Sequence, residues 1–269
     1  MGILETAGTC PQTSRGRVNG GWENVVNGAQ TPTSRPWTAR MPAIDLVILD
    51  CDGTLMDSER IAAEVESAML AECGVTISPE EYERRFAGTS SEQAFREVEK
   101  EAGRALPEDY LARVDAEILR RFRTEVKSVP GAHDILDRFD QPRCVCSNSS
   151  MAKLEAELRR ANLWDRFRPY IFSAHDLPDC EEKPAPDVFL HACREFGVEP
   201  RRAIVLEDSV SGVTAARAAG CRTVGFSGTA RSKSHADLLT EAGAETVIFR
   251  LGDFPELIEV FGAWEGLDA

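Results

Sequence analysis

Short apolar runs alternate with longer amphipathic stretches over most of this chain. The apolar runs predict strands at residues 46–49, 144–146, 170–172, 203–206, 223–226 and 246–249. Runs that are apolar throughout are typical of parallel strands covered by helices on both faces. Between the later strands, apolar residues recur at spacings of three and four and predict helices at residues 135–139, 154–161, 187–196 and 213–219. This alternation predicts an α/β fold with a doubly wound parallel sheet and right-handed crossovers.

The stretch after the first predicted strand contains helical patterns and no convincing strand. Apolar stripes run from Ile61 to Leu70, along residues 91–102, and along residues 111–122. A Val-Pro-Gly break at residues 129–131 ends the stretch, and the strand–helix alternation then resumes. We therefore predict an α/β core made of residues 41–57 and 129–269, with a helical cap made of residues 58–128.

Residues 1–40 have a different composition from the rest of the chain. They are rich in Gly, Thr, Ser, Pro and Asn and show no helical or strand period, which predicts a disordered tail. Several arginines and few acids are also features of organelle transit peptides, but the Gly and Pro residues argue against the amphipathic helix that such a peptide needs. Met41 stands just before the first strand, and we hypothesise that translation begins there. Mass spectrometry of the native N-terminus tests this, because residues found upstream of Met41 would refute it.

Composition narrows the class of protein. The chain has 269 residues, 42% hydrophobic and 28% charged, which is typical of a globular protein, and no apolar run is long enough to cross a bilayer. A net charge of −14 argues against a nucleic-acid partner, since neutralised phosphates supply most of that affinity. The eight cysteines form neither a disulfide framework nor a metal knuckle. We therefore expect a cytoplasmic protein with reduced thiols and no membrane partner, as a monomer or a small homo-oligomer.

Polar residues follow three of the predicted strands. These clusters are Asp50 with Asp52, Ser147 with Asn148, and Glu207 with Asp208. Each cluster alone has a plain interpretation as a turn, a helix cap or a solvated loop. However, the carboxyl ends of parallel strands meet at one edge of a sheet, where ligands bind, and Lys183 opens a helix on the same side. Neighbouring carboxylates are also costly without a cation or a shared proton, so their joint occurrence favours a catalytic site.

Four motifs of the chain resemble those of the haloacid dehalogenase superfamily. They are Asp50-x-Asp52-Gly53-Thr54-Leu55-x-Asp57-Ser58-Glu59, Ser147-Asn148, Lys183-Pro184-x-Pro186-Asp187, and Glu207-Asp208-Ser209 with Gly212. The resemblance covers roughly residues 43–257 in the family's order and spacing. The helical insert resembles the family's helical C1 cap. The chain looks closest to the β-phosphoglucomutase-like phosphatases, including members similar to 6-phosphogluconate phosphatase.

The resemblance implies a chemical role for the carboxylates. Asp50 would be the nucleophile that forms an aspartyl-phosphate, and Asp52 would be the general acid and base. Mg²⁺ would be the cofactor, bound by the Asp50 carboxylate, the Asp52 backbone carbonyl and Asp208, with Glu207 in support. The superfamily's dehalogenases and phosphonatases lack an aspartate at the place of Asp52, so its presence favours phosphate esters.

The resemblance also implies which residues bind the phosphate. Ser147, the backbone N–H of Asn148 and Lys183 would hold the oxygens of the transferred phosphoryl group, with Thr54 supporting them.

In the cap, the resemblance places a turn opposite the active site. Residues of this turn would read the substrate, with an arginine able to clamp a carboxylate or a pair of hydroxyls. They are Arg84, Arg85, Gly88, Thr89 and Ser90.

The resulting prediction is a Mg²⁺-dependent phosphatase acting on a small phosphorylated metabolite, either a sugar phosphate or a sugar-acid phosphate. One alternative is a hexose-phosphate mutase of the β-phosphoglucomutase kind, in which Asp50 returns the phosphoryl group to a sugar hydroxyl. Another is a catalytically idle binding module on the same fold, since a fold does not dictate a function. The presence of every expected chemical residue argues against the idle module.

Overall fold

The structure is a computed structural model of the chain, and the residues described are 44–86, 89, 91–229 and 234–263. All of them belong to one compact unit that spans residues 39–269. The predicted tail at residues 1–40 therefore lies outside the described residues, as do Gly88 and Ser90. Among the described helices, none combines the length and the apolar character that crossing a membrane requires.

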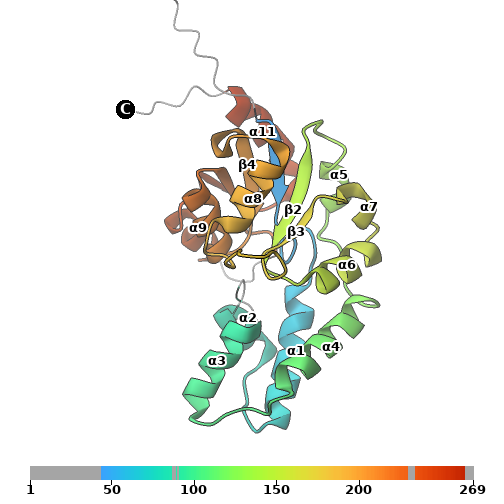
Figure 1. Ribbon diagram of the computed structural model, residues 1–269, viewed down its shortest axis with the longest axis vertical. Coiled ribbons are helices and arrows are strands. Elements are labelled where there is room, and N and C mark those ends of the chain that lie inside the picture. Colours follow the sequence, from blue (N-terminus) through green and yellow to red (C-terminus); the bar gives the residue numbers. More distant parts are fainter. Residues whose placement is uncertain (1–43, 87–88, 90, 230–233, 264–269) are drawn as a thin grey trace, which may run out of the picture. The chain divides into compact units, whose positions relative to one another are not determined.

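Six parallel strands form one sheet in the order β3-β2-β1-β4-β5-β6. The strands are β1 (Leu46–Leu49), β2 (Arg143–Ser147), β3 (Ile171–Ser173), β4 (Ala203–Glu207), β5 (Arg222–Phe226) and β6 (Thr246–Ile248). This confirms the predicted doubly wound α/β fold. The chain runs outward from β1 to β3 and then returns to place β4 on the other side of β1 (Figure 1). The loops after β1 and β4 therefore diverge, which leaves a crevice at the carboxyl ends of these strands.

Helices cover both faces of the sheet, as the wholly apolar strands predict. Leu46 and Ile48 of β1 pack with α8 (Asp187–Phe196) and α9 (Val210–Ala219), whereas Val47 and Leu49 face the opposite layer. That layer contains α5 (Ala132–Ile135), α6 (Met151–Arg160), α7 (Trp164–Phe167) and α11 (Phe254–Ala263). The remaining elements are α10 (His235–Glu241) and the short 3₁₀ helices η1 (Pro200–Arg202) and η2 (Leu251–Asp253). All four β1 side chains are fully buried, and each such apolar side chain stabilises the fold by about 1.5–3 kcal/mol.

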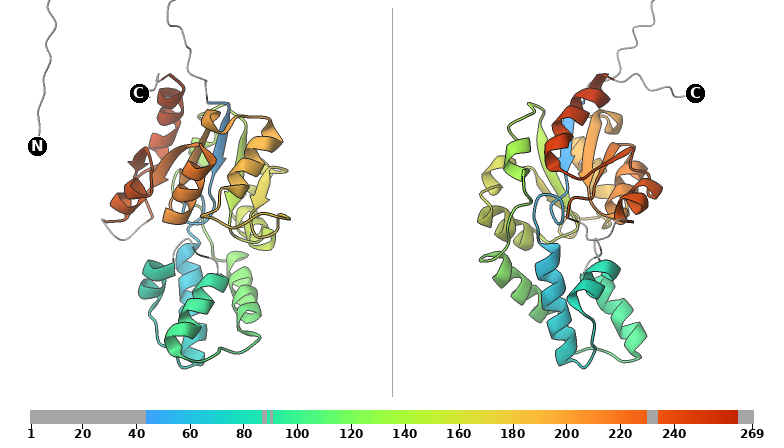
Figure 2. Two further views of the ribbon diagram at one scale, coloured as in Figure 1. Left: turned by 60° about the vertical axis from the view of Figure 1, so that its left-hand side comes forward. Right: turned by 180° about the vertical axis from the view of Figure 1, so that it is seen from behind.

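Within the residues that the structure describes, four helices and no strand lie between β1 and the Val-Pro-Gly break at residues 129–131. They are α1 (Glu59–Glu72), α2 (Pro79–Phe86), α3 (Ser91–Ala102) and α4 (Tyr110–Phe122), and Figure 2 shows them grouped together. The sequence analysis was wrong to place Arg84 and Arg85 in a turn, because both residues belong to the last turn of helix α2. It buries Tyr82 and Phe86, a pair too short to show a helical period. The functional division into core and cap stays a prediction.

Candidate active site

The buried ammonium group of Lys183 joins three strands at the carboxyl edge of the sheet. Its Nζ donates to Oδ1 of Asp50 at 2.7 Å, to Oε1 of Glu207 at 2.5 Å and to the backbone oxygen of Cys146 at 2.8 Å. Asp50 follows β1 directly, and its N–H donates to the Leu206 oxygen of β4 at 3.0 Å. The structure thus brings together Asp50, Lys183 and Glu207, which come from three separate parts of the sequence.

Negative charge exceeds positive charge at this edge. Burial, followed by the charge of Glu207, raises the pKa of Asp50 well above its ordinary value, although Lys183 opposes the shift. Burial and then the charge of Asp50 likewise raise the pKa of Asp208. Burial alone would lower the pKa of Lys183, but the charges of Asp50 and Glu207 raise it. The lysine therefore stays charged. Its single positive charge is too small to neutralise the several carboxylates around it.

Three hydroxyl groups hold the carboxylate of Asp52. Ser58, just before α1, donates to Oδ1 at 2.6 Å, while Ser149 and Ser147 donate to Oδ2 at 2.8 Å and 3.2 Å. The sequence analysis gave Ser147 a role but gave none to Ser58 or Ser149. Ser58 belongs to the first motif and Ser149 lies just after the second, but neither motif indicated this contact with Asp52.

The side chains of Asn148 and Thr54 contact two residues of the site, Lys183 and Asp208. Asn148 accepts a hydrogen bond from the Lys183 N–H at 2.8 Å and donates to the Lys183 oxygen at 3.2 Å, which fixes the backbone of the lysine. Thr54 is fully buried, and its hydroxyl is 3.5 Å from Oδ1 of Asp208, at the limit of a hydrogen bond. Both residues therefore orient charged groups that face the pocket.

Two glycines allow the carboxylates to pack closely against the backbone. Gly53 has φ +76°, and a Cβ added there would lie 1.9 Å from Oδ2 of Asp208. A Cβ added to Gly212, near the start of α9, would lie 1.9 Å from Cδ of Glu207. Ser209 caps the same helix and donates to Oε2 of Glu207 through its hydroxyl at 2.9 Å and its N–H at 3.0 Å. Any residue with a Cβ at these glycines would displace the carboxylates.

The carboxylates fit a hard divalent cation. Asp50, Glu207 and Asp208 each offer an oxygen, and these oxygens all lie within 4.8 Å of one another. Oxygen donors with an excess of negative charge are what Mg²⁺ prefers. Both oxygens of Glu207 already accept hydrogen bonds, from Lys183 and Ser209, whereas the contact that Thr54 makes with the Asp208 carboxylate is a weak one. Asp50 and Asp208 are therefore the better candidates for direct ligands.

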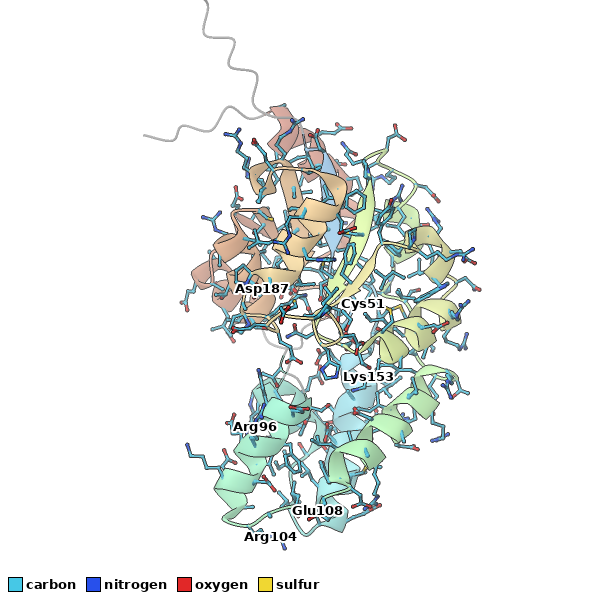
Figure 3. The ribbon with its side chains drawn as sticks, in the orientation of Figure 1. Cys51, Arg96, Arg104, Glu108, Lys153 and Asp187 are labelled. Carbon is cyan, nitrogen blue, oxygen red and sulfur yellow. The ribbon has the colours of Figure 1, made fainter. Side chains whose placement is uncertain are left out.

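A pocket of about 240 Å³ opens onto these groups. The predicted site residues that line it are Asp50, Asp52, Thr89, Ser147, Asn148, Lys183 and Asp208. Residues that the sequence analysis did not single out also line it, among them Glu66, Tyr82, Phe86, Asp115 and Lys153. Lys153, which Figure 3 labels, belongs to α6. Its Nζ lies 2.7 Å from Oδ1 of Asp115 on α4. These side chains lie on helix faces that the sequence also requires for packing, so no local motif distinguishes them.

Arg84 and Arg85 do not meet the expectation that they face the active site. Neither Arg84 nor Arg85 is among the described residues that line the pocket. Arg85 bonds to Glu101 of α3 at 2.7 Å, and its guanidinium lies 4.7 Å from the centre of the Phe86 ring. Because α2 continues to Phe86, it directs Arg85 toward α3 instead of the pocket. Gly88 and Ser90, from the same predicted turn, lie outside the described residues.

Comparisons with known proteins agree with this arrangement. A sequence model of the haloacid dehalogenase-like hydrolases matches residues 44–220. The 6-phosphogluconate phosphatase of Escherichia coli is 33% identical over 187 residues, which cover 69% of this chain and 84% of that protein.

Two solved structures extend the comparison. A haloacid dehalogenase-like protein of unknown function from Agrobacterium tumefaciens is 46% identical, with a TM-score of 0.74 over 81% of this chain and 99% of that one. A hydrolase of the same family from Deinococcus radiodurans, solved with bound phosphate and sodium, is 27% identical, with a TM-score of 0.68 over 83% of this chain and 98% of that one.

Proposed function

This chain belongs to the haloacid dehalogenase-like hydrolases, and from that premise we propose that it is a Mg²⁺-dependent phosphatase acting on a small sugar phosphate or sugar-acid phosphate. The observation that carries the proposal is the contact of Lys183 with both Asp50 and Glu207, in a pocket that Asp52 also lines. The E. coli relative acts on a phosphorylated sugar acid, as its name says, and the Deinococcus relative binds phosphate. Both support a phosphate ester as the substrate of this chain.

In the first step, Asp50 attacks the phosphorus atom and forms an aspartyl-phosphate while the bond to the leaving oxygen breaks. Asp52 gives its proton to that oxygen, so that the product leaves as a neutral alcohol. Three serine hydroxyls hold the Asp52 carboxylate in position for this transfer. Lys183 and the residues after β2, Ser147 and Asn148, would hold the phosphoryl oxygens, because such transfers depend on positioning and charge stabilisation.

In the second step, Asp52 accepts a proton from a water molecule that attacks the phosphorus atom. The bond between phosphorus and Asp50 breaks, which releases inorganic phosphate and restores the Asp50 carboxylate. Lys183 stays bonded to Asp50 and keeps that carboxylate in place between turnovers.

Asp50 and Asp208 would hold the Mg²⁺ ion, with Glu207 beside them. When bound, the ion would neutralise part of the charge on the phosphoryl oxygens. Burial raises the pKa of both Asp50 and Asp208, and the charge of Glu207 adds to the shift of Asp50 while that of Asp50 adds to the shift of Asp208.

The test is phosphate release with Mg²⁺ across a panel of sugar phosphates and phosphorylated sugar acids. We expect release by the wild type and a loss of at least about a thousandfold in Asp50→Asn, which removes the nucleophile. Asp45→Asn is the matched control, because Asp45 precedes the same strand at its opposite end and pairs with Arg202 on the surface. Mass spectrometry of acid-quenched wild type should find phosphate on the peptide that contains Asp50.

Other outcomes would contradict the proposal in different ways. Interconversion of sugar-phosphate isomers without release of phosphate would favour the mutase. Equal phosphate release by the wild type and Asp50→Asn would exclude Asp50 as the nucleophile. No reaction in either assay would favour the idle binding module.

We also propose that the protein works in a reducing compartment such as the cytoplasm. All seven cysteines among the described residues are free, and five of them are buried. Free buried cysteines are typical of reducing compartments, where structural disulfides are rare. This supports the expectation of reduced thiols.

A further inference from the structure

Glu66 is a buried carboxylate in the middle of the helical segment. It lies on α1 with 3% of its surface exposed. The Tyr110 hydroxyl of α4 donates to its Oε2 at 2.9 Å. Burial raises the pKa of Glu66, while the hydroxyls of Tyr110, Ser91 and Tyr82 favour its charged form. Residues of α1, α2, α3 and α4 thus surround this one carboxyl group.

The second oxygen of Glu66 accepts no hydrogen bond of ordinary geometry from the described residues, although the hydroxyls of Ser91 and Tyr82 lie near the carboxyl group. Oε1 is fully buried, and no hydrogen bond reaches it within the part of the chain that the structure describes. Leaving a buried acceptor unsatisfied costs about 1–3 kcal/mol, and more if the group is charged. Glu66 lines the same pocket as Asp50, Asp52 and Lys183. Because Oε1 has no exposed surface in this structure, a bound molecule would reach it only after the Glu66 side chain turns toward the pocket, and a hydrogen-bond donor on that molecule would then be its partner.

The charge of the pocket restricts what that molecule can be. The described lining contains nine carboxylates, two lysines, one histidine and no arginine. Lys183 is bonded to Asp50 and Glu207, and Lys153 is bonded to Asp115 at 2.7 Å. A second negative group on the substrate would thus lie among carboxylates, and both lysines of the described lining already have acidic partners. Such a juxtaposition of like charges disfavours the wrong ligand.

We propose that the substrate is the phosphate monoester of an uncharged, polyhydroxylated alcohol, and that one of its hydroxyls donates a hydrogen bond to Oε1 of Glu66. The leaving group would be a sugar or a sugar alcohol and would carry neither a carboxylate nor a second phosphate. This inference rests on the proposed phosphatase activity and narrows its substrate class. It also separates this chain from the E. coli relative, whose named substrate carries a carboxylate.

The test compares matched substrates in the wild type, Glu66→Gln and Glu97→Gln. The substrates are glucitol 6-phosphate and other neutral polyol and sugar monophosphates, 6-phosphogluconate, and 4-nitrophenyl phosphate, whose leaving group has no aliphatic hydroxyl. Glu97 is the control because it lies on α3 with 59% of its side chain exposed. Circular dichroism and a thermal melt check that each variant is folded.

We expect the wild type to have a kcat/KM for its best neutral substrate at least about tenfold above that for 6-phosphogluconate. Glu66→Gln should lower kcat/KM for the neutral substrate by about tenfold or more, mainly through KM, and leave 4-nitrophenyl phosphate within about twofold. Glu97→Gln should change neither.

A wild-type preference for 6-phosphogluconate would overturn the inference, and so would an equal loss on both substrate types in Glu66→Gln. If Glu66→Gln does not fold, the wild-type preference alone decides. Hydrolysis of 4-nitrophenyl phosphate would keep the phosphatase proposal when the substrate inference fails, whereas no hydrolysis of any ester would remove both.

Discussion

The residues around Glu207 pack so closely that they leave no space for a larger side chain. This carboxylate is fully buried and bonded to Lys183 and Ser209, and a Cβ added to Gly212 of α9 would lie 1.9 Å from its Cδ. A methyl group at Gly212 would overlap Cδ of Glu207, so either the carboxylate or the start of α9 would have to move. Since Glu207 also positions Lys183, a change at Gly212 would also affect the lysine that we propose holds the phosphoryl oxygens.

We therefore predict that Gly212→Ala lowers the free energy of unfolding by about 1–3 kcal/mol and reduces kcat/KM by at least about tenfold. The control is Gly252→Ala, because the nearest atom to a Cβ there is 3.8 Å away. Urea unfolding and phosphate release measure the two effects. Equal behaviour of the two variants would show that Glu207 adjusts without cost.

Glu157 is a second buried acid, located beneath the site on α6. Its side chain is fully buried, Cys51 donates to its Oε1 at 3.2 Å, and its Oε2 has no partner among the described residues. Burial, followed by the charge of Asp52, raises its pKa well above the ordinary value of 4.5. The folded protein therefore binds a proton here more tightly than the unfolded chain.

The sign of the pH effect follows from that difference. The stabilisation from Glu157 is fully present below the pKa of the unfolded chain and is lost as the pH rises through the higher folded-state pKa. We predict that the Glu157→Gln variant does not show this loss. The difference in free energy of unfolding, variant minus wild type, should therefore increase between pH 5 and pH 8 by on the order of 1 kcal/mol or more. Urea unfolding at several pH values measures it. Glu155→Gln on the same helix, where the side chain is 46% exposed, should run parallel to wild type.

At the scale of elements, the sheet and the helical segment are joined by two chain crossings that pair with each other. The Asp57 N–H donates to the Lys127 oxygen at 2.9 Å, and the Val129 N–H donates to the Leu55 oxygen at 2.8 Å. Met56 and Ser128 form an antiparallel bridge between these bonds. Such short connections can absorb backbone rotation while the helices remain intact.

We predict that α1–α4 close over the sheet about these connections when a ligand binds. The radius of gyration from small-angle scattering should fall when Mg²⁺ and a phosphate analogue are added to the wild type. Asp208→Asn should show a smaller change at the same ligand concentration, because it removes a proposed ligand of the ion. An unchanged radius in the wild type would argue against closure.

At the scale of the whole molecule, charge links stability to the cofactor. The chain carries a net charge of −14, and several carboxylates gather at the end of β1 around one lysine. A cation that binds the folded state and not the unfolded state stabilises the protein by mass action, by about 2.7 kcal/mol at a concentration of 100 times its Kd.

We predict that millimolar Mg²⁺ raises the melting temperature and that Asp208→Asn abolishes most of the rise. NaCl at matched ionic strength is the control for general screening of the negative charge. Removal of divalent cations with a chelator should return the melting temperature to its starting value and stop phosphate release. An equal rise with NaCl would mean that the effect is not specific to the site.

Much of the fold and part of the candidate site follow from the sequence by itself. Fully apolar strands such as Leu46–Leu49 must be covered on both faces, and this determines a parallel α/β sheet. Because Asp50, Ser147 and Glu207 each stand at the end of such a strand, the sequence also indicates that they meet at one edge. These inferences succeed because they depend on local pattern and on a general rule for parallel sheets.

Only the tertiary structure decided which distant side chains touch. Strand order put β4 beside β1, and this allows Lys183 to contact Asp50 and Glu207 together. The direction of α2 turned Arg85 toward Glu101 and away from the pocket. Glu66 lines the pocket because the packing of four helices places it there. From the sequence around it, one could predict only that Glu66 lies on one face of an amphipathic helix. Periodicity places a side chain on a face, but the partner of that face depends on packing between segments far apart in the chain.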